Sequence, residues 1–131
     1  MPLFRITVYL NVGPDNFAGL KPGDPLATST DLQLTVTAAH PDAAAEQAYA
    51  IGNRIDTDDR GRGWPADVRS VSVGDLLKIS GQAETVFYTV TGIGFHAIPE
   101  PADPTVPLTG TPATSRQPSE DPKPGQAGDQ L

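Results

Sequence analysis

The chain contains no cysteine, which excludes disulfides, thiolate metal sites and a thiol nucleophile. Aromatic residues are few (one Trp, three Tyr and four Phe among 131 residues), and nine basic residues face 16 acidic ones. The formal charge of −7 argues against a dedicated nucleic-acid binder, because such proteins present a basic face. No apolar run reaches the roughly 18 residues that span a membrane, and no leader-like segment opens the chain. These absences predict a cytoplasmic protein.

The residues that are present divide the chain into two parts. Half of the 14 prolines follow Pro99, in a segment with no aromatic ring and almost no large aliphatic residue. Such a segment buries too little apolar surface to offset the entropy lost on ordering. We therefore expect a single folded domain over residues 2–98 and a disordered, Pro/Gly/Ser-rich tail over 99–131. The tail has five acidic and two basic residues, a net charge of −3, which leaves −4 for the domain.

Alternation of apolar with polar residues predicts the strands of this domain. It is clearest at residues 4–10 and 32–36, and short apolar segments at 76–79, 86–90 and 95–98 indicate three further strands. The first two are expected to pair antiparallel across a long loop, Phe17–Ser29. The third and fourth are separated by Ser80–Glu84, which is typical of a hairpin turn.

One helix is predicted between the second and third strands. Pro41 suits the first helical position, and His40 precedes it as a helix-start residue. Gly52 and Asn53 favour the end of the helix. Four apolar residues share one face: Ala44, Ala48, Ile51 and Ile55. The order β-β-α-β-β-β predicts an α+β fold in which a single helix packs on a small antiparallel sheet.

The polar stretch Gly52–Asp75 holds the only tryptophan and four of the six arginines. Arginine binds carboxylates and phosphates through two parallel hydrogen bonds, and a tryptophan ring offers a stacking face. This composition predicts a contact surface made of Arg54, Arg60, Arg62, Trp64 and Arg69. A local alternative stays open, in which the arginines pair with the interleaved acids of the same loop, Asp56, Asp58, Asp59 and Asp67.

Asp56–Asp67 partly matches a calcium-binding loop. Asp56, Asp58, Gly61 and Asp67 occupy its first, third, sixth and twelfth positions. Arg60, however, stands at the fifth position, where an oxygen ligand is required. We therefore interpret the segment as a solvated acidic loop and expect no metal site.

Ser70-Val71-Ser72-Val73-Gly74-Asp75 also carries polar groups at regular spacing. A serine nucleophile needs a base within reach, and the only histidines, His40 and His96, have no triad-like neighbour. Asp75 after Gly74 is typical of a turn in which the carboxylate accepts backbone N–H bonds. The sequence therefore predicts a structural turn here, and neither an enzyme nor a cofactor.

These residues nevertheless form a pattern. Asn53, the Pro-containing loop Trp64–Asp67, the run Arg69–Leu77 with its Arg-Ser-Val-Ser-Val-Gly-Asp motif, Tyr88 and Gly94–Ile98 together resemble the YodL-like domain family, over about residues 49–98. The resemblance is also to short accessory proteins of GC-rich bacteria. It implies a mobile-element or accessory context and a non-enzymatic, interaction-type role. The matching positions are Asn53, Arg69, Ser70, Ser72, Gly74, Asp75 and Phe95.

The expected function is that of a small cytoplasmic protein-interaction module without cofactor or membrane association, serving as an accessory protein of a phage, plasmid or integrated element. The partner is a protein that the sequence does not identify. The alternative is a nucleic-acid-associated accessory protein that uses the Arg/Trp loop, which the net charge disfavours.

Overall fold

A computed structural model describes residues 1–15, 18–101 and 105–107. Its elements, in chain order, are β1 (Leu3–Asn11), β2 (Leu26–Thr28), the 3₁₀ turn η2 (Thr30–Leu32), β3 (Gln33–Thr37), α1 (Pro41–Gly52), β4 (Leu76–Ser80), β5 (Thr85–Thr91), β6 (Gly94–Ile98) and β7 (Thr105–Pro107).

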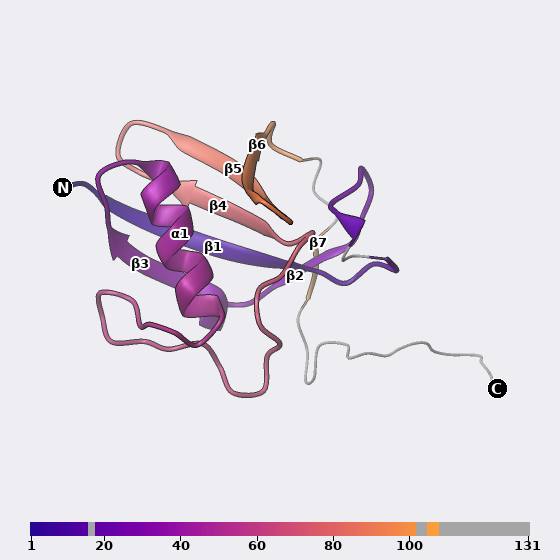
Figure 1. Ribbon diagram of the computed structural model, residues 1–131, viewed down its shortest axis with the longest axis horizontal. Coiled ribbons are helices and arrows are strands. Elements are labelled where there is room, and N and C mark those ends of the chain that lie inside the picture. The colour runs from indigo at the N-terminus through magenta and orange to yellow at the C-terminus, as the bar shows by residue number, and fades with distance from the viewer. Residues whose placement is uncertain (16–17, 102–104, 108–131) are drawn as a thin grey trace.

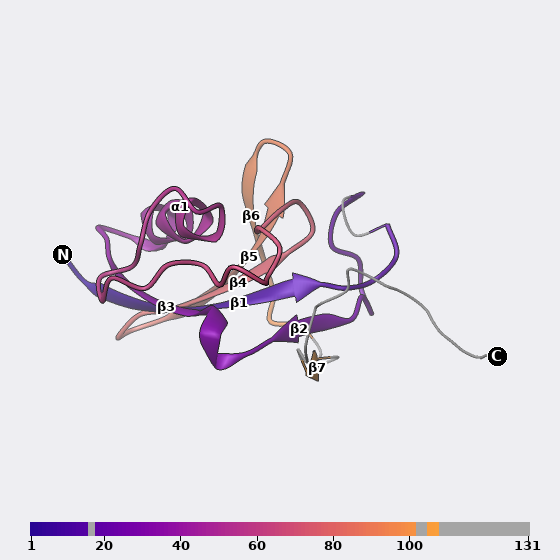
Figure 2. The same ribbon diagram turned by 90° about the horizontal axis from the view of Figure 1, so that it is seen from below.

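The strands form one sheet with α1 on one of its faces (Figures 1 and 2). The order runs β6-β5-β4-β1, and β1 then pairs with two short strands: with β3 along Leu3–Thr7 and with β2 at Leu10–Asn11. These pairings are antiparallel, whereas β7 lies parallel to β2. The predicted α+β architecture, with one helix on a largely antiparallel sheet, is confirmed.

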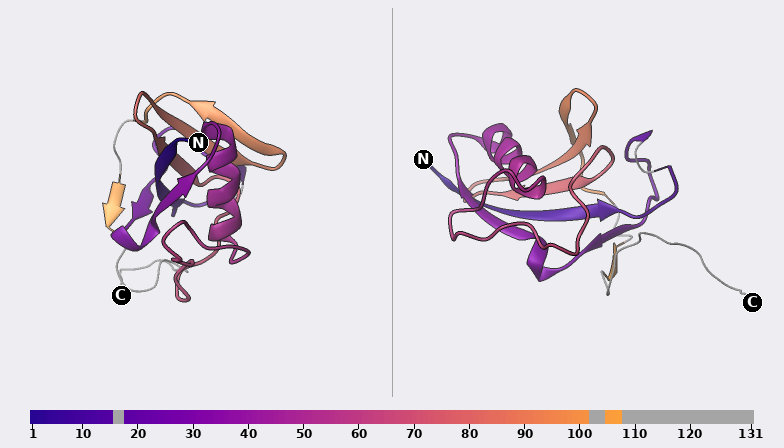
Figure 3. Two further views of the ribbon diagram at one scale, coloured as in Figure 1. Left: turned by 90° about the vertical axis from the view of Figure 1, so that its left-hand side faces the viewer. Right: turned by 60° about the horizontal axis from the view of Figure 1, so that its bottom comes forward.

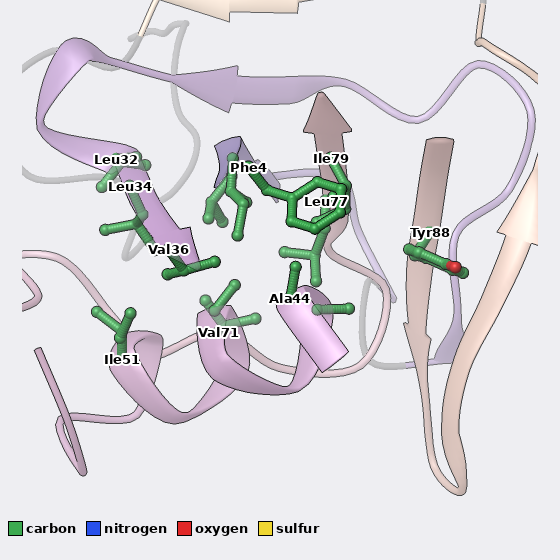
Figure 4. Packing of buried hydrophobic residues seen from close by; sticks show 14 of the residues in the cluster. Phe4, Leu32, Leu34, Val36, Ala44, Ile51, Val71, Leu77, Ile79 and Tyr88 are labelled. Atoms are coloured by element: carbon green, nitrogen blue, oxygen red, sulfur yellow. The ribbon is translucent and has the colours of Figure 1, made fainter. Parts of the chain in front are cut away.

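The core lies between α1 and the sheet (Figure 4). The alternation along β1 sends every second side chain from Phe4 to Leu10 into it, as predicted. Small residues on the buried face of α1, among them Ala44 and Ala48, let the helix approach the strands closely. Val71 comes from the segment between α1 and β4, so this segment contributes to the core although it contains neither helix nor strand.

Both ends of α1 are fixed by side chains. His40 Nδ1 accepts a hydrogen bond from the Ala43 N–H, as expected for a helix-start residue. At the other end, Asn53 Nδ2 donates to the carbonyls of Tyr49 and Val71. Ile55 was predicted on the apolar face of the helix, but it lies beyond the last turn and is largely exposed.

A hydrogen bond joins the start of α1 to β5, because the Tyr88 hydroxyl donates to the Asp42 carboxylate. Burial and this bond to an acidic partner raise the pKa of Tyr88 to about 12. The phenol therefore keeps its proton and remains a donor throughout the ordinary pH range.

Two short strands were not predicted. β2 lies within Phe17–Ser29, which was interpreted as loop, and each of its three residues pairs with a neighbouring strand or with β7. β7 lies within 99–131, the predicted tail, where Thr105–Pro107 pairs with β2. Residues 102–104 and 108–131 of the predicted tail lie outside the described residues.

Gly52 provides a test of the contact between helix and loop. Alanine normally favours a helix over glycine by about 1 kcal/mol. A Cβ at Gly52, however, would lie 2.3 Å from Val71 Cγ2. We expect Gly52→Ala to lower the free energy of unfolding by about 1–3 kcal/mol, as overpacking does, in urea denaturation. Gly63→Ala is the control, because its nearest neighbour would be 3.9 Å away. Equal stability of the two variants would contradict this packing.

Candidate anion-binding face

The segment between α1 and β4, residues 53–75, is held in place by arginine side chains that point into it. The Arg54 guanidinium donates to the carbonyls of Pro65 and Val68, at 2.9 and 2.5 Å, and to Ser70 Oγ at 2.8 Å. Its backbone is in the left-handed region, with φ of 63°, which turns the chain back after the helix. Arg54 therefore closes the loop on itself.

Trp64 is the apolar anchor of the same loop. Its side chain is only 6% exposed and belongs to the hydrophobic core. Its indole N–H donates to the Arg69 carbonyl over 2.8 Å, which satisfies the one polar atom of the ring. No face of this ring is available for stacking on a ligand.

Arg69 makes a two-point ion pair with Asp75. Its two terminal nitrogens lie 2.8 and 2.7 Å from the carboxylate oxygens. Asp75 is completely buried, and it also accepts the backbone N–H groups of Asn11 and Ser72. A buried charge is tolerated only when it is paired and fully hydrogen-bonded, and this carboxylate has four donors.

The remaining residues of the Arg69–Asp75 motif complete this arrangement. Ser70 Oγ accepts from Arg54, and Ser72 Oγ accepts from Arg69. Gly74 has φ of 94°, a conformation that favours glycine, and its N–H donates to the Val90 carbonyl. The prediction of a structural turn is therefore confirmed, including the backbone N–H bond that Asp75 accepts.

Asn53 and Phe95, the other two motif positions, also act within the fold. Asn53 ties the end of α1 to the loop, as described above. Phe95 is half-buried and makes edge-to-face contacts with Tyr49 and Tyr88, at centroid distances of 6.0 and 6.4 Å.

The five residues predicted to share one surface are thus divided between two places. Trp64 as a stacking platform is a wrong prediction, because the ring is buried. Arg54 is exposed and Arg69 half-buried, but both guanidinium groups are bonded to the loop itself, to backbone carbonyls and to Asp75 rather than to the acids of Asp56–Asp67. Arg60 and Arg62 are exposed.

A tight turn built on Asp58 presents Arg60 and Arg62 to solvent. The buried Asp58 carboxylate accepts the N–H groups of both arginines at 2.9 Å and the Thr35 N–H at 3.0 Å. In addition, the Asp59 N–H donates to the Thr35 carbonyl. These bonds attach the turn to the outer edge of β3, so the two arginines lie at the rim of the sheet.

Beside this turn, on the sheet face opposite α1, lies a groove of about 550 Å³. Its cations are Arg5 from β1, Lys78 from β4, and Arg60 and Arg62 from the turn; hydroxyl and amide side chains complete the lining: Thr7, Gln33, Thr35 and Ser80. We call this the cationic groove. Figure 2 shows α1 on the other side of the sheet.

Strand register accounts for the two cations on the sheet. Arg5 is opposite Ser80, and Thr7 is opposite Lys78, so Arg5 and Lys78 are diagonal neighbours on one face. Neither side chain, nor that of Arg60, has a hydrogen-bond or ion-pair partner among the described residues, whereas Arg62 lies 3.9 Å from the exposed Asp31. Three of the four cations of the groove therefore have no partner within the described fold.

Arg5 and Lys78 were not predicted as site residues. Each occupies a polar position in a predicted strand, which indicates that its side chain faces solvent. That these two strands are neighbours follows only from the sheet order.

Other kinds of site find no support among the described residues. No group of three or more His, Asp or Glu side chains gathers there in a metal-binding arrangement. In the calcium-like loop, Asp58 already accepts three backbone N–H bonds. No helix in the described ranges has the length and hydropathy of a membrane span.

Comparisons with known proteins return nothing: no family model, no curated protein and no solved structure matches this chain.

Asp75→Asn tests the central ion pair. The amide would remove the charge that Arg69 faces and turn an N–H₂ group toward other donors. We expect a loss of about 3–5 kcal/mol in the free energy of unfolding, as for a broken buried pair, measured by urea denaturation. Asp56→Asn, at an exposed position of the same loop, is the control. A similar small effect for both would show that the pair does not hold the fold.

Asp58 makes stability depend on pH. Burial by itself raises the pKa of this carboxyl, but the three backbone N–H donors and the nearby Arg62 outweigh it, so the pKa is lowered. A lowered pKa in the folded state stabilises the protein above the pKa of the unfolded state, and this contribution disappears as the pH falls through the folded value.

We therefore expect Asp58→Asn to destabilise the protein most above about pH 5, and the difference from wild type to shrink below about pH 4. Urea denaturation across this range measures it. A difference that does not change with pH would contradict the assignment.

Proposed function

We propose that this protein is a small, non-enzymatic, cytoplasmic interaction module that binds an acidic segment of a partner protein in the cationic groove. One observation supports this most directly. Of the seven Arg and Lys residues in the described part of the chain, Arg54 and Arg69 hold the loop together, and four of the other five line the groove.

Charge distribution favours a short acidic segment over a long polyanion. The domain carries a net charge of −4, so a nucleic-acid backbone that extends beyond the groove meets an acidic surface. A peptide with a few carboxylates needs only the groove. Arginine is suited to carboxylates because its planar fork donates two parallel hydrogen bonds.

The accessory role in a phage, plasmid or integrated element belongs to the same proposal. It rests on the resemblance of residues 49–98 to YodL-like domains. The residues that carry this resemblance, including Arg69 and Asp75, act inside the fold. The proposed binding surface therefore lies outside the motif.

Single-stranded nucleic acid is the second candidate, and a specific feature favours it. Tyr9 and Phe87 lie on the same sheet face as the groove, each about half-buried, and Phe87 is directly opposite Lys78. Aromatic rings beside cations are the usual platform for unpaired bases.

Fluorescence anisotropy at low salt, with a glutamate-rich peptide and a single-stranded oligonucleotide of equal charge, distinguishes the two. We expect tighter binding of the peptide. Arg60→Glu should weaken it by about tenfold, roughly 1.4 kcal/mol, because Arg60 has no partner within the described fold. Lys21→Glu is the matched control: it changes net charge equally but lies on the wall of a different cavity.

Three outcomes would change the proposal. Equal effects of the two variants would mean that only overall charge matters. Tighter binding of the oligonucleotide would favour the second candidate. Binding of neither probe would remove the cationic groove as a contact surface.

A further inference from the structure

Two edge strands of the sheet, β3 and β6, differ in whether their outer backbone groups are bonded. At β3 the outer edge is closed, because the Thr35 N–H and C=O bond the turn at Asp58–Asp59, and the Thr37 carbonyl accepts from Gln47. At the opposite edge, β6 pairs with β5 on one side, and no strand of the described residues pairs with the other. Figure 3 shows the β5–β6 hairpin, in orange, at the β6 edge of the sheet.

The direction of the free backbone groups on β6 follows from its neighbour. Val90 donates its N–H to the Asp75 carbonyl and accepts from the Gly74 N–H, so its peptide groups point away from β6. Val90 is paired with Phe95. In an antiparallel ladder, when the N–H and C=O groups of one residue point away from its partner, those of the partner also point away from it. Along each strand, residues that bond across the pair alternate with residues that do not. Phe95 and Ala97 therefore present their N–H and C=O groups to the outside.

Exposed edges in proteins are normally protected by lysine, proline, a bulge or a covering loop. Residues 92–98 read Gly-Ile-Gly-Phe-His-Ala-Ile and contain no charge and no proline. Ile93, at the tip of the hairpin, is fully exposed. This edge has the properties of a surface that pairs with another strand.

We propose that β6 pairs with β6 of a second copy of this chain, antiparallel and about a two-fold axis through His96. This register is self-complementary. Phe95 of each copy stands opposite Ala97 of the other, and these are the residues whose N–H and C=O groups point outward. Two such pairs give four backbone hydrogen bonds across the interface.

The side chains agree with this register. His96 meets its own counterpart, and the exposed Ile93 meets Pro99 of the second copy, so no like charges are opposed. The axis is perpendicular to the sheet, which places α1 of both copies on the same face. There Tyr49, which is 38% exposed and contacts Phe95, adds aromatic surface to the interface. This proposal is independent of the cationic groove.

Substituting His96 by residues of opposite charge tests the proposed β6–β6 pairing. His96→Asp and His96→Lys each place two like charges opposite one another, and we expect the dimer dissociation constant to rise at least about tenfold in each. An equimolar mixture should restore a dimer, because Asp then faces Lys. Sedimentation velocity over a concentration series of the full chain measures this. His96→Thr is the neutral control and should dimerise like wild type.

Because His96 is exposed, these variants should keep the wild-type circular dichroism spectrum. Arg60→Glu should leave sedimentation unchanged, which separates this test from that of the groove. A wild-type chain that sediments as a monomer throughout the series would overturn the proposal. So would dimers of the Asp and Lys variants as stable as wild type, or a mixture that fails to restore dimers, since another edge or surface would then be in use.

Discussion

The carboxylate of Asp75 connects parts of the chain that are far apart in sequence. It binds Arg69 of the long loop and the backbone of Asn11 at the end of β1, and its residue's own carbonyl accepts from Thr89 on β5. Because the carboxylate is completely buried, each donor it lacks would cost free energy. The position of residues 53–75 therefore depends on this charged group together with the core packing of Trp64, Val68 and Val71.

That dependence explains the concentration of arginine in the loop. A segment without helix or strand leaves many carbonyls unpaired, and a guanidinium can satisfy several of them at once. Arg54 and Arg69 do so within the loop, and Trp64 supplies the apolar contact. Asp58 then closes a turn that directs Arg60 and Arg62 the other way. A single arginine-rich stretch thus stabilises the fold and charges the opposite sheet face.

Local pattern predicted most of the fold. Alternation located the main strands, Pro41 and Asn53 marked the helix, and Gly74-Asp75 indicated the turn. It could not find β2 and β7, since three residues are too short to show alternation. It also could not separate the arginines that bond the loop from those that line the groove, because the partners of Arg54 are backbone carbonyls, which any sequence has.

The cationic groove was beyond prediction for a related reason. Arg5 and Lys78 lie far apart in the chain and become neighbours only because β4 pairs with β1. Pairing over such distances is set by the packing of the whole domain.

The sheet order also relates the two proposed surfaces. The loop that closes the β3 edge builds the groove, whereas the opposite edge, β6, is left open. Pairing at β6 about an axis perpendicular to the sheet brings the grooves of both copies to one side of a continuous sheet. A partner with two acidic segments could then engage both, and the second contact would form at the high effective concentration of a linked site. Contacts between exposed charges are individually weak. Two of them engaged together would bind the partner firmly without a larger groove.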